Sequence, residues 1–161
     1  MVWYDRPEEN HDGEHFRENR CMLNNRRTVR IEWGDCDPAG IVYFPRYAEW
    51  FDACTAALFE AAGFPKSDLI NIRGIGIPMV KTRSEFFLPL RFGEETTVET
   101  TIPRLGRSSF DVHHRMLKGV QLAVECFETR VWTRIAPADP KTLKSEPIPQ
   151  EVRAGLSREA R

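Results

Sequence analysis

Polar and apolar residues alternate strictly over residues 28–33, a period of two that is typical of a β-strand with one buried face. Val29, Ile31 and Trp33 would share that face. Residues 34–40 follow with two glycines, a proline and two aspartates, a composition typical of a segment in which the chain turns. The pattern therefore predicts a strand that leads directly into a loop.

The spacing of apolar residues changes at Pro45. They now recur at steps of three and four, as on one face of a helix, at Tyr47, Trp50, Phe51, Cys54, Leu58, Ala61 and Ala62. Pro45 suits the first helical turn, and Gly63 suits the residue that ends the helix. Residues 53–62 contain only Thr55 and Glu60 as polar residues, which predicts a helix covered on most of its sides.

The segment after this helix has the pattern of strands. A loop through Gly74 and Gly76 precedes them, and that segment lacks the βαβ setting of a dinucleotide-binding motif. We expect strands at residues 78–90, 95–103, 108–117 and 120–135, separated by short turns that contain glycine and therefore favour antiparallel neighbours. In the last strand the apolar phase shifts between Val124 and Phe127, which predicts a bulge.

One strand, one long helix and four further strands predict an α+β fold, with an antiparallel five-stranded sheet packed on a single central helix. The length of 161 residues suits one domain, which we place at residues 26–136. Residues 1–25 are polar with little periodicity and predict an N-terminal extension, and residues 137–161 predict a loose C-terminal arm rich in proline.

Composition narrows the function classes. A formal net charge of −1 favours a small-molecule ligand over nucleic acid, and no apolar stretch is long enough for a membrane span. The N-terminal residues lack the basic start and apolar run of a signal peptide. The four cysteines are widely spaced without a CxxC pair, which favours free thiols over a metal site and predicts a cytoplasmic protein.

Asp35 and Asp37 are the first candidates for chemistry. Aspartate in a glycine-bounded loop commonly bonds its own downstream backbone and serves only the turn. Here, however, the loop leads within a few residues to a helix N-terminus, whose free N–H groups can stabilise an oxyanion. A carboxylate that faces such a site is the minimum set for acyl transfer.

Residues 31–47, which include the run GDCDPAGIV, and the following Trp50, Phe51 and Asp52 resemble the opening strand, loop and helix of 4-hydroxybenzoyl-CoA thioesterases of the hot dog superfamily. The resemblance covers roughly residues 27–135 and leaves both terminal segments outside. It implies the hot dog fold and hydrolysis of an aromatic or short acyl-CoA to the free acid and CoA. It implies no metal and no redox cofactor.

The resemblance also implies roles for individual residues. Asp37 matches the catalytic aspartate, a nucleophile or general base, and Phe44 matches the position whose backbone amide polarises the thioester carbonyl. Asp52 matches an aspartate that meets the substrate's ring hydroxyl, and Tyr47 is a further substrate-contact candidate on the same helix. Arg107, Ser108 and Ser109 match a region that contacts the nucleotide end of CoA.

Several alternatives stay open. Asp52 and Arg107 also fit solvated surface residues. Phe44 stands where related Tol-Pal-linked acyl-CoA thioesterases usually carry a histidine, which favours an aryl-CoA substrate. A hot dog hydratase or dehydratase would need a histidine beside the aspartate, and the loop has none; a non-catalytic acyl-CoA-binding protein is the other alternative.

His113 and His114 are adjacent on a predicted strand, so they must point to opposite faces of the sheet. We expect His114 in the core and His113 at the surface or an interface. A single curved sheet on one helix also leaves an unpaired edge, which favours a homodimer or homotetramer with its active site between subunits.

Overall fold

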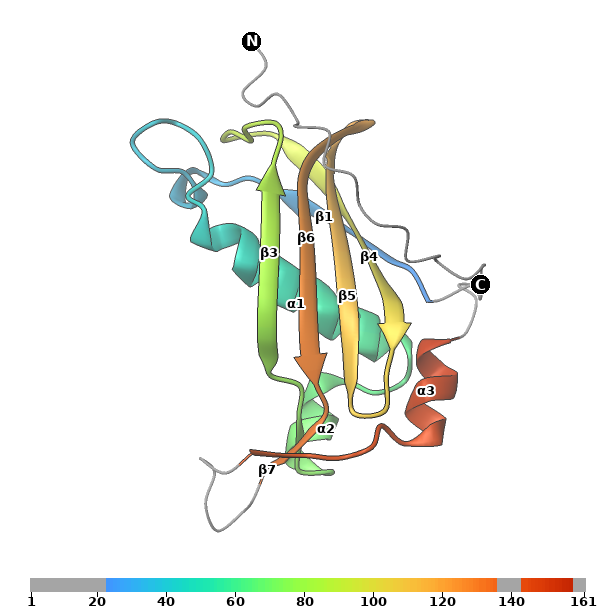
Figure 1. Cartoon of the computed structure of the whole chain (residues 1–161). Helices are drawn as coiled ribbons and strands as arrows, with labels where there is room; N and C mark the ends of the chain where they lie inside the picture. Colours follow the sequence, from blue (N-terminus) through green and yellow to red (C-terminus); the bar gives the residue numbers. More distant parts are fainter. Residues whose placement is uncertain (1–22, 136–142, 158–161) are drawn as a thin grey trace.

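Five strands form one antiparallel sheet around helix α1 (Figure 1). The computed structural model describes residues 23–135 and 143–157. In spatial order the strands are β1 (Asn25–Arg30), β4 (Glu95–Leu105), β5 (Ser109–Lys118), β6 (Gln121–Val131) and β3 (Met79–Phe86). Helix α1 (Pro45–Ala61) begins at the predicted proline. The predicted α+β architecture, a five-stranded antiparallel sheet on one long central helix, is confirmed.

Two clusters of buried side chains lie along α1. The first half of the helix contributes Tyr47, Phe51 and Cys54 to a cluster with residues of β4, β5 and β6. The second half contributes Leu58 and Phe59 to a cluster that extends to the C-terminal segment. Because both halves of α1 are covered, the helix is fixed along its length, and the loop before it is fixed with it.

The first strand lies earlier in the chain than predicted. Ile31 is fully buried, but a 3-10 helix, η1 (Trp33–Asp35), follows it. Trp33 is 77% exposed and packs edge-on against Phe92 with ring centroids 5.7 Å apart. The alternation of the sequence continues beyond the point where the chain leaves the sheet, so the prediction that Trp33 shares a strand face with Val29 and Ile31 is wrong.

The predicted last strand contains a bulge, but at another residue. The register between β5 and β6 shifts at Ala123, where Ala123 and Val124 are both buried. After the bulge the buried face carries Val124, Cys126 and then two charged residues, Glu128 and Arg130. The apparent change of phase towards Phe127 arose because charged residues occupy core positions.

A second small sheet lies beside the end of α1, where the sequence predicted only a loop. A short helix, α2 (Lys66–Asn71), leads into β2 (Ile75–Gly76), which pairs with β7 (Thr133–Ile135). The β7 strand also pairs with β8 (Leu143–Ser145). The Gly74-Ile75-Gly76 segment is therefore partly strand, and the predicted strand 120–135 divides into β6 and β7.

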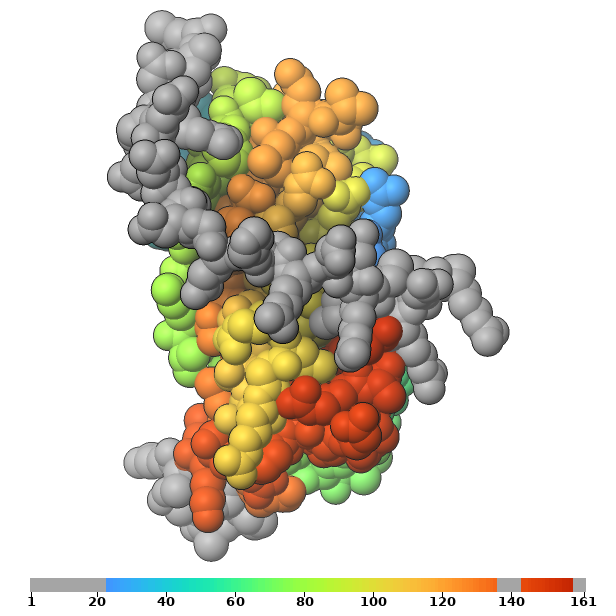
Figure 2. All heavy atoms as spheres, turned by 45° about the vertical axis from the view of Figure 1, so that its right-hand side comes forward, coloured from blue at the N-terminus to red at the C-terminus, as the bar shows by residue number. Residues whose placement is uncertain are grey.

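The C-terminal segment is part of the packed body. Helix α3 (Gln150–Leu156) lies against the end of the main sheet, as the red atoms beside the yellow β4–β5 region in Figure 2 show. Ile148, Val152 and Leu156 are buried in the same cluster as Leu58 and Phe59. The prediction of a loose arm is wrong for residues 143–157, because three apolar side chains there close one end of the core.

The start of the described chain packs against α3 as well. The Leu23 side chain is buried, and its N–H donates to the Leu156 carbonyl oxygen over 3.2 Å. The other residues of the predicted N-terminal extension, up to residue 22, lie outside the described part. Within that part, no helix is long and apolar enough to cross a membrane.

Replacing Val152 by Ala should destabilise the fold by about 2 kcal/mol, because it removes two buried methyl groups and leaves a small cavity. The control Gln150→Ala lies in the same helix on the exposed side and should stay within about 0.5 kcal/mol of the parent chain. Denaturant unfolding measures both. Equal stabilities for the two variants would contradict the packing of α3 in the core.

Candidate active site

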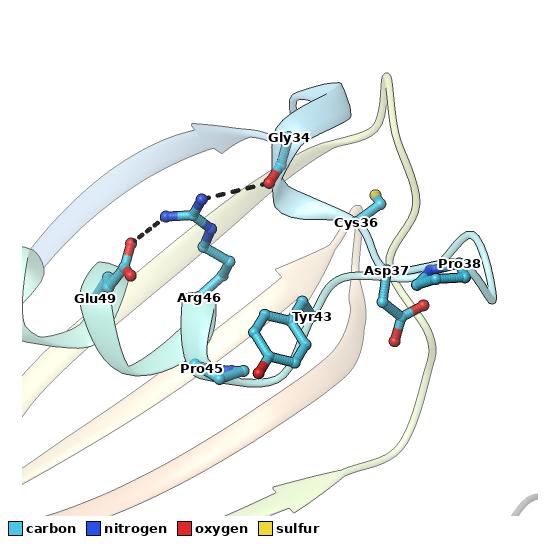
Figure 3. A pocket seen from close by; sticks show the side chains of 8 residues that line it. All are labelled: Gly34, Cys36, Asp37, Pro38, Tyr43, Pro45, Arg46 and Glu49. Carbon is cyan, nitrogen blue, oxygen red and sulfur yellow. Dashed lines mark hydrogen bonds and ion pairs between the residues drawn. The ribbon is translucent and has the colours of Figure 1, made fainter.

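A hollow of about 480 Å³ lies where the loop after β1 meets the first turn of α1 (Figure 3). Asp37 and Tyr43 line it from the loop, and Pro45, Arg46 and Glu49 line it from the start of the helix. The hollow therefore brings together the loop carboxylate and the helix N-terminus, the two features that the sequence suggested for acyl transfer.

The loop is a tight hairpin that the backbone holds in place. Cys36 and Val42 form an isolated bridge, and the Asp37 N–H donates to the Ile41 carbonyl oxygen over 2.9 Å. The Gly40 N–H donates to the Asp37 carbonyl oxygen over 2.9 Å, and Gly40 has a φ of +73°. This left-handed conformation favours glycine, so the sequence fixes the turn that presents Asp37.

The two loop aspartates differ in their contacts. Asp35 serves the local structure: its Oδ2 accepts the Glu32 N–H over 2.9 Å, and its Oδ1 lies 3.5 Å from the Arg46 Nε. Asp37 is half-buried, and its Oδ1 accepts the Ala39 N–H over 2.8 Å. Its Oδ2 accepts no hydrogen bond from residues 23–135 or 143–157, so this oxygen can face a ligand.

Phe44 is the N-cap of α1 and has helical backbone angles, φ −53° and ψ −33°. Its N–H donates to no backbone or side-chain acceptor in the described part of the chain. Its side chain is exposed. An amide at the start of a helix with no acceptor of its own is a ready donor for a carbonyl oxygen or oxyanion.

Arg46 ties the first turn of α1 to the loop, which the sequence did not indicate. Its Nη1 donates to Glu49 Oε2 over 2.7 Å, and its Nη2 donates to the Gly34 carbonyl oxygen over 3.4 Å. In Figure 3 the Arg46–Glu49 pair and the Asp37 carboxylate lie on opposite sides of the Tyr43 ring. Arg46 thus fixes the geometry of the hollow without pairing with Asp37.

Tyr47 lies in the core and does not line this hollow. Its ring packs edge-on against Trp50 and Phe86, with centroids 5.6 Å and 5.2 Å away. Burial raises the pKa of its hydroxyl to about 12. The contact of Tyr47 with substrate stays a prediction, and in a single chain Tyr47 supports the helix start.

Asp52 lies about two turns after the start of α1 and lines a second hollow of about 410 Å³. Its Oδ2 accepts from Lys66 Nζ and its Oδ1 from Arg130 Nη1, each over 2.8 Å. Burial raises the pKa of this carboxyl, but the two cations outweigh burial and hold it below its usual value. Asp52 is thus neither a freely solvated residue nor a neighbour of Asp37 in this chain.

Arg107, Ser108 and Ser109 lie at the turn between β4 and β5, far from Asp37. The loop of Asp37 leaves the sheet beside Glu94, where the Ile31 N–H bonds the Glu94 carbonyl, and the turn follows the opposite end of β4. Eleven residues of strand place the two ends roughly 30 Å apart. Their contact with CoA stays a prediction.

His114 is fully buried under α1, as predicted. Its Nδ1 lies 2.9 Å from Thr100 Oγ1, and its ring stacks on Phe51 at 4.8 Å. Its Nε2 lies 3.4 Å from Thr55 Oγ1 and 3.7 Å from the buried Glu128 carboxylate. Glu128 links His114 to Arg130, and Arg130 contacts Asp52. The sequence pattern did not predict this chain of contacts, because charged residues are not expected on the buried face of a strand.

Acid should destabilise the fold through His114. Burial holds the pKa of His114 below its ordinary 6.5, although Glu128 acts in the opposite direction. Between the folded pKa and pH 6.5, His114 is protonated in the unfolded chain and neutral in the folded chain. The free energy of unfolding is therefore highest above pH 6.5 and decreases as the pH falls from 6.5 towards the folded pKa.

The slope from this one proton is at most about 1.4 kcal/mol per pH unit. Denaturant unfolding between about pH 7 and 5 measures it, and His114→Gln should flatten the curve. An unchanged slope in that variant would contradict the assignment.

Among the described residues, no group of three or more His, Cys, Asp or Glu side chains is placed to hold a metal ion. Cys36, Cys54 and Cys126 are free. His113 points to the other face of the sheet, with its Nε2 2.7 Å from Glu125 Oε1 and its ring stacked on Phe127.

Comparison with known proteins places the chain in a family. Residues 31–156 match the model of the Thioesterase-like superfamily. The 4-hydroxybenzoyl-CoA thioesterase of Pseudomonas sp. (strain CBS-3) is 33% identical over 129 residues, which cover 76% of this chain and 89% of that protein. A 1,4-dihydroxy-2-naphthoyl-CoA hydrolase of Synechococcus sp. (strain WH7803) is 31% identical over 97 residues, 56% of this chain and 63% of that protein.

The solved structures agree with the sequences. A gentisyl-coenzyme A thioesterase superposes with a TM-score of 0.71 at 32% identity, over 83% of this chain and 100% of that one. The hot dog fold expected from the resemblance is thereby confirmed. With the family model covering most of the chain, and with a relative matched over nearly its whole length, this protein belongs to the thioesterase-like, hot dog family of 4-hydroxybenzoyl-CoA thioesterases.

Proposed function

We propose that this protein hydrolyses a thioester between coenzyme A and a hydroxylated aromatic acyl group, which yields the free acid and CoA. Its family supports the enzyme class, a thioester hydrolase that acts on acyl-CoA. The single observation that carries the proposal is the place of the half-buried Asp37 carboxylate, in a hollow at the start of α1, where the N-cap amide of Phe44 has no acceptor among the described residues.

The proposed chemistry divides between these two groups. The Phe44 N–H donates to the thioester oxygen and stabilises the negative charge that develops there. Asp37 either attacks the carbonyl carbon or removes a proton from the water that attacks it. In either case the bond from the carbonyl carbon to sulfur breaks, and CoA leaves as a thiolate that takes up a proton. When Asp37 is the base, the attacking water supplies the oxygen of the free acid. When Asp37 is the nucleophile, the acyl group stays on it as a mixed anhydride, which water then hydrolyses to the free acid and the Asp37 carboxylate. This route needs no metal and no redox cofactor, because the helix terminus supplies the electrophilic assistance.

The relatives and the second hollow support an aromatic acyl group. The three proteins compared above are named for 4-hydroxybenzoyl, 1,4-dihydroxy-2-naphthoyl and gentisyl thioesters of CoA. In this chain Asp52 offers an ionised acceptor in a hollow with Ile77 and Pro78 among its apolar lining residues. A hydroxyl on the ring would donate to Asp52 while the ring packs on the apolar lining.

The free edge of the sheet supports a dimer. Among the described strands β3 pairs with β6 alone, and all eight of its residues are exposed, Val80 and Phe86 among them. An unpaired edge of this kind is a template for a second copy of the same strand. Met79 belongs both to this edge and to the second hollow, so a dimer through β3 would place that hollow at the subunit interface. Sedimentation equilibrium of the purified protein measures the oligomeric state, and a monomer at micromolar concentration would contradict the dimer.

A cytoplasmic location remains part of the proposal, and the free thiols of Cys36, Cys54 and Cys126 agree with a reducing compartment. Fractionation of the source cells tests it, because recovery outside the cytoplasm would contradict it.

A panel of CoA esters, read with a thiol reagent, tests the function. We expect thiol release from hydroxybenzoyl-type esters and slower release from aliphatic ones. A protein that binds these esters without releasing thiol would be an acyl-CoA-binding protein. Hydration of an enoyl ester without thiol release would identify a hydratase. Either result would contradict the proposed thioesterase.

A further inference from the structure

The second hollow, which Asp52 lines, contains charged side chains among its apolar lining residues. Four charged side chains, Asp52, Lys66, Glu128 and Arg130, line it together with apolar residues such as Ile77. Two of the four, Glu128 and Arg130, have almost no exposed side-chain surface. The chemistry proposed for Asp37 and Phe44 does not use this cluster, so its buried charges need an explanation of their own.

The guanidinium of Arg130 is held in place by Glu128. Its Nε donates to Glu128 Oε2 over 2.8 Å, and both side chains are at most 4% exposed. Glu128 in turn lies 3.7 Å from the Nε2 of the buried His114. Because Glu128 fixes one edge of the guanidinium, the Nη1 on the other edge is presented to Asp52 in one orientation.

Asp52 is held from two sides. Arg130 donates to one carboxylate oxygen and Lys66 to the other, each over 2.8 Å, while 46% of the Asp52 side chain stays exposed. Each carboxylate oxygen has two lone-pair directions, so both oxygens keep a direction for a further donor. The two cations also favour the ionised carboxylate.

The charge balance of the cluster decides which ligand group fits. Two carboxylates and two cations cancel, so the hollow has no net charge that would attract an anion or a cation. What it offers is a fixed acceptor within an apolar lining, which suits a neutral donor on a ring, such as a phenolic hydroxyl. Phe44 and Asp52 are eight residues apart on α1, about 12 Å along the axis. A hydroxybenzoyl group with a hydrogen bond at each end has a comparable length.

We propose that Arg130, anchored by Glu128, and Lys66 are positioning residues that hold Asp52 as the acceptor for a hydroxyl group on the acyl part of the substrate. The inference rests on the proposed thioesterase function. It assigns the preference for hydroxylated over plain aromatic acyl groups to a charge network that spans α1, α2 and β6. It also explains why charged residues occupy two core positions of β6.

The test compares 4-hydroxybenzoyl-CoA with benzoyl-CoA as substrates for matched variants. The ratio of their kcat/KM values reports the hydroxyl contact alone, because the thioester is the same in both. Lys66→Met keeps the aliphatic stem and removes the ammonium group. Lys118→Met is its control, since Lys118 has similar exposure and pairs with Glu94 away from the second hollow.

We expect Lys66→Met to lower the preference for the hydroxylated ester about tenfold, mostly through KM, and Lys118→Met to leave it unchanged. The double variant Glu128→Gln, Arg130→Met removes both buried charges and should lower the preference at least as much. Arg130→Lys should restore part of it relative to the double variant. Lys66→Met carries the test if a β6 variant fails to fold, because Lys66 is partly exposed.

Two outcomes would overturn the inference while the proposed function stands. One is a parent enzyme that hydrolyses both esters without preference. The other is a set of variants in which both rates fall equally, which would identify the network as structural support only. Absence of thiol release from every ester by the parent enzyme would instead overturn the proposed function itself.

Discussion

Replacing Asp37 by Asn should reduce thioester turnover by roughly 10²- to 10⁴-fold, the range in which a positioned base or nucleophile contributes to an enzyme. Asparagine keeps an Oδ1 that can accept the Ala39 N–H, so the hairpin should persist. It removes the negative charge that either an attack on the carbonyl or the activation of water requires. The measurement is kcat on the best ester of the CoA panel.

Glu49→Gln is the matched control for this experiment. Glu49 lines the same hollow, but its carboxylate pairs with Arg46 on the surface of the helix. The control should change turnover only a few-fold, and both variants should unfold within about 0.5 kcal/mol of the parent chain. Near-normal turnover by the Asp37 variant would exclude Asp37 as the catalytic carboxylate.

Replacing Phe44 by Pro should reduce kcat by roughly 10²- to 10³-fold, as the loss of one oxyanion donor does in other enzymes. Proline removes the N–H and the exposed ring but should leave the backbone in place, because the φ of −53° at Phe44 is within the range that a proline ring adopts. Proline is also tolerated at the start of a helix, where the N–H has no helical partner.

The control at the same position is Phe44→Ala, which removes the exposed ring and keeps the amide. It should keep kcat within a few-fold of the parent value. Equal losses in the two variants would show that the side chain of Phe44 matters and that its amide does not. Circular dichroism of both variants verifies that α1 still forms.

Local patterns were sufficient for much of the fold. The period of the apolar residues after Pro45 predicted α1, and period-two patterns with glycine turns predicted the strands of the main sheet. The same patterns failed at Trp33 and Phe127. Trp33 continues the polar–apolar alternation although the chain has already left the sheet. Phe127 suggested a change of the buried face, because the true core positions next to it carry the charged residues Glu128 and Arg130.

The candidate site was predictable in part for a similar reason. Asp37 and the helix start are only a few residues apart, so sequence distance already brought them together. Only the structure distinguishes the role of Asp37 from that of Asp35, because it shows that the Asp35 carboxylate contacts Glu32 and Arg46. Arg107 matched a family region in sequence, yet it lies at the other end of β4.

The sequence by itself thus determined the central helix, the strands around it, the glycine hairpin with Asp37, and the family. Each of these depends on residues that are neighbours along the chain. Tertiary structure alone decided that α3 closes the core, and that Arg130, buried beside Glu128, contacts Asp52. These features join β6 and the C-terminal segment to helices 70 or more residues away. No local period encodes such contacts, because their energy arises only when distant segments meet.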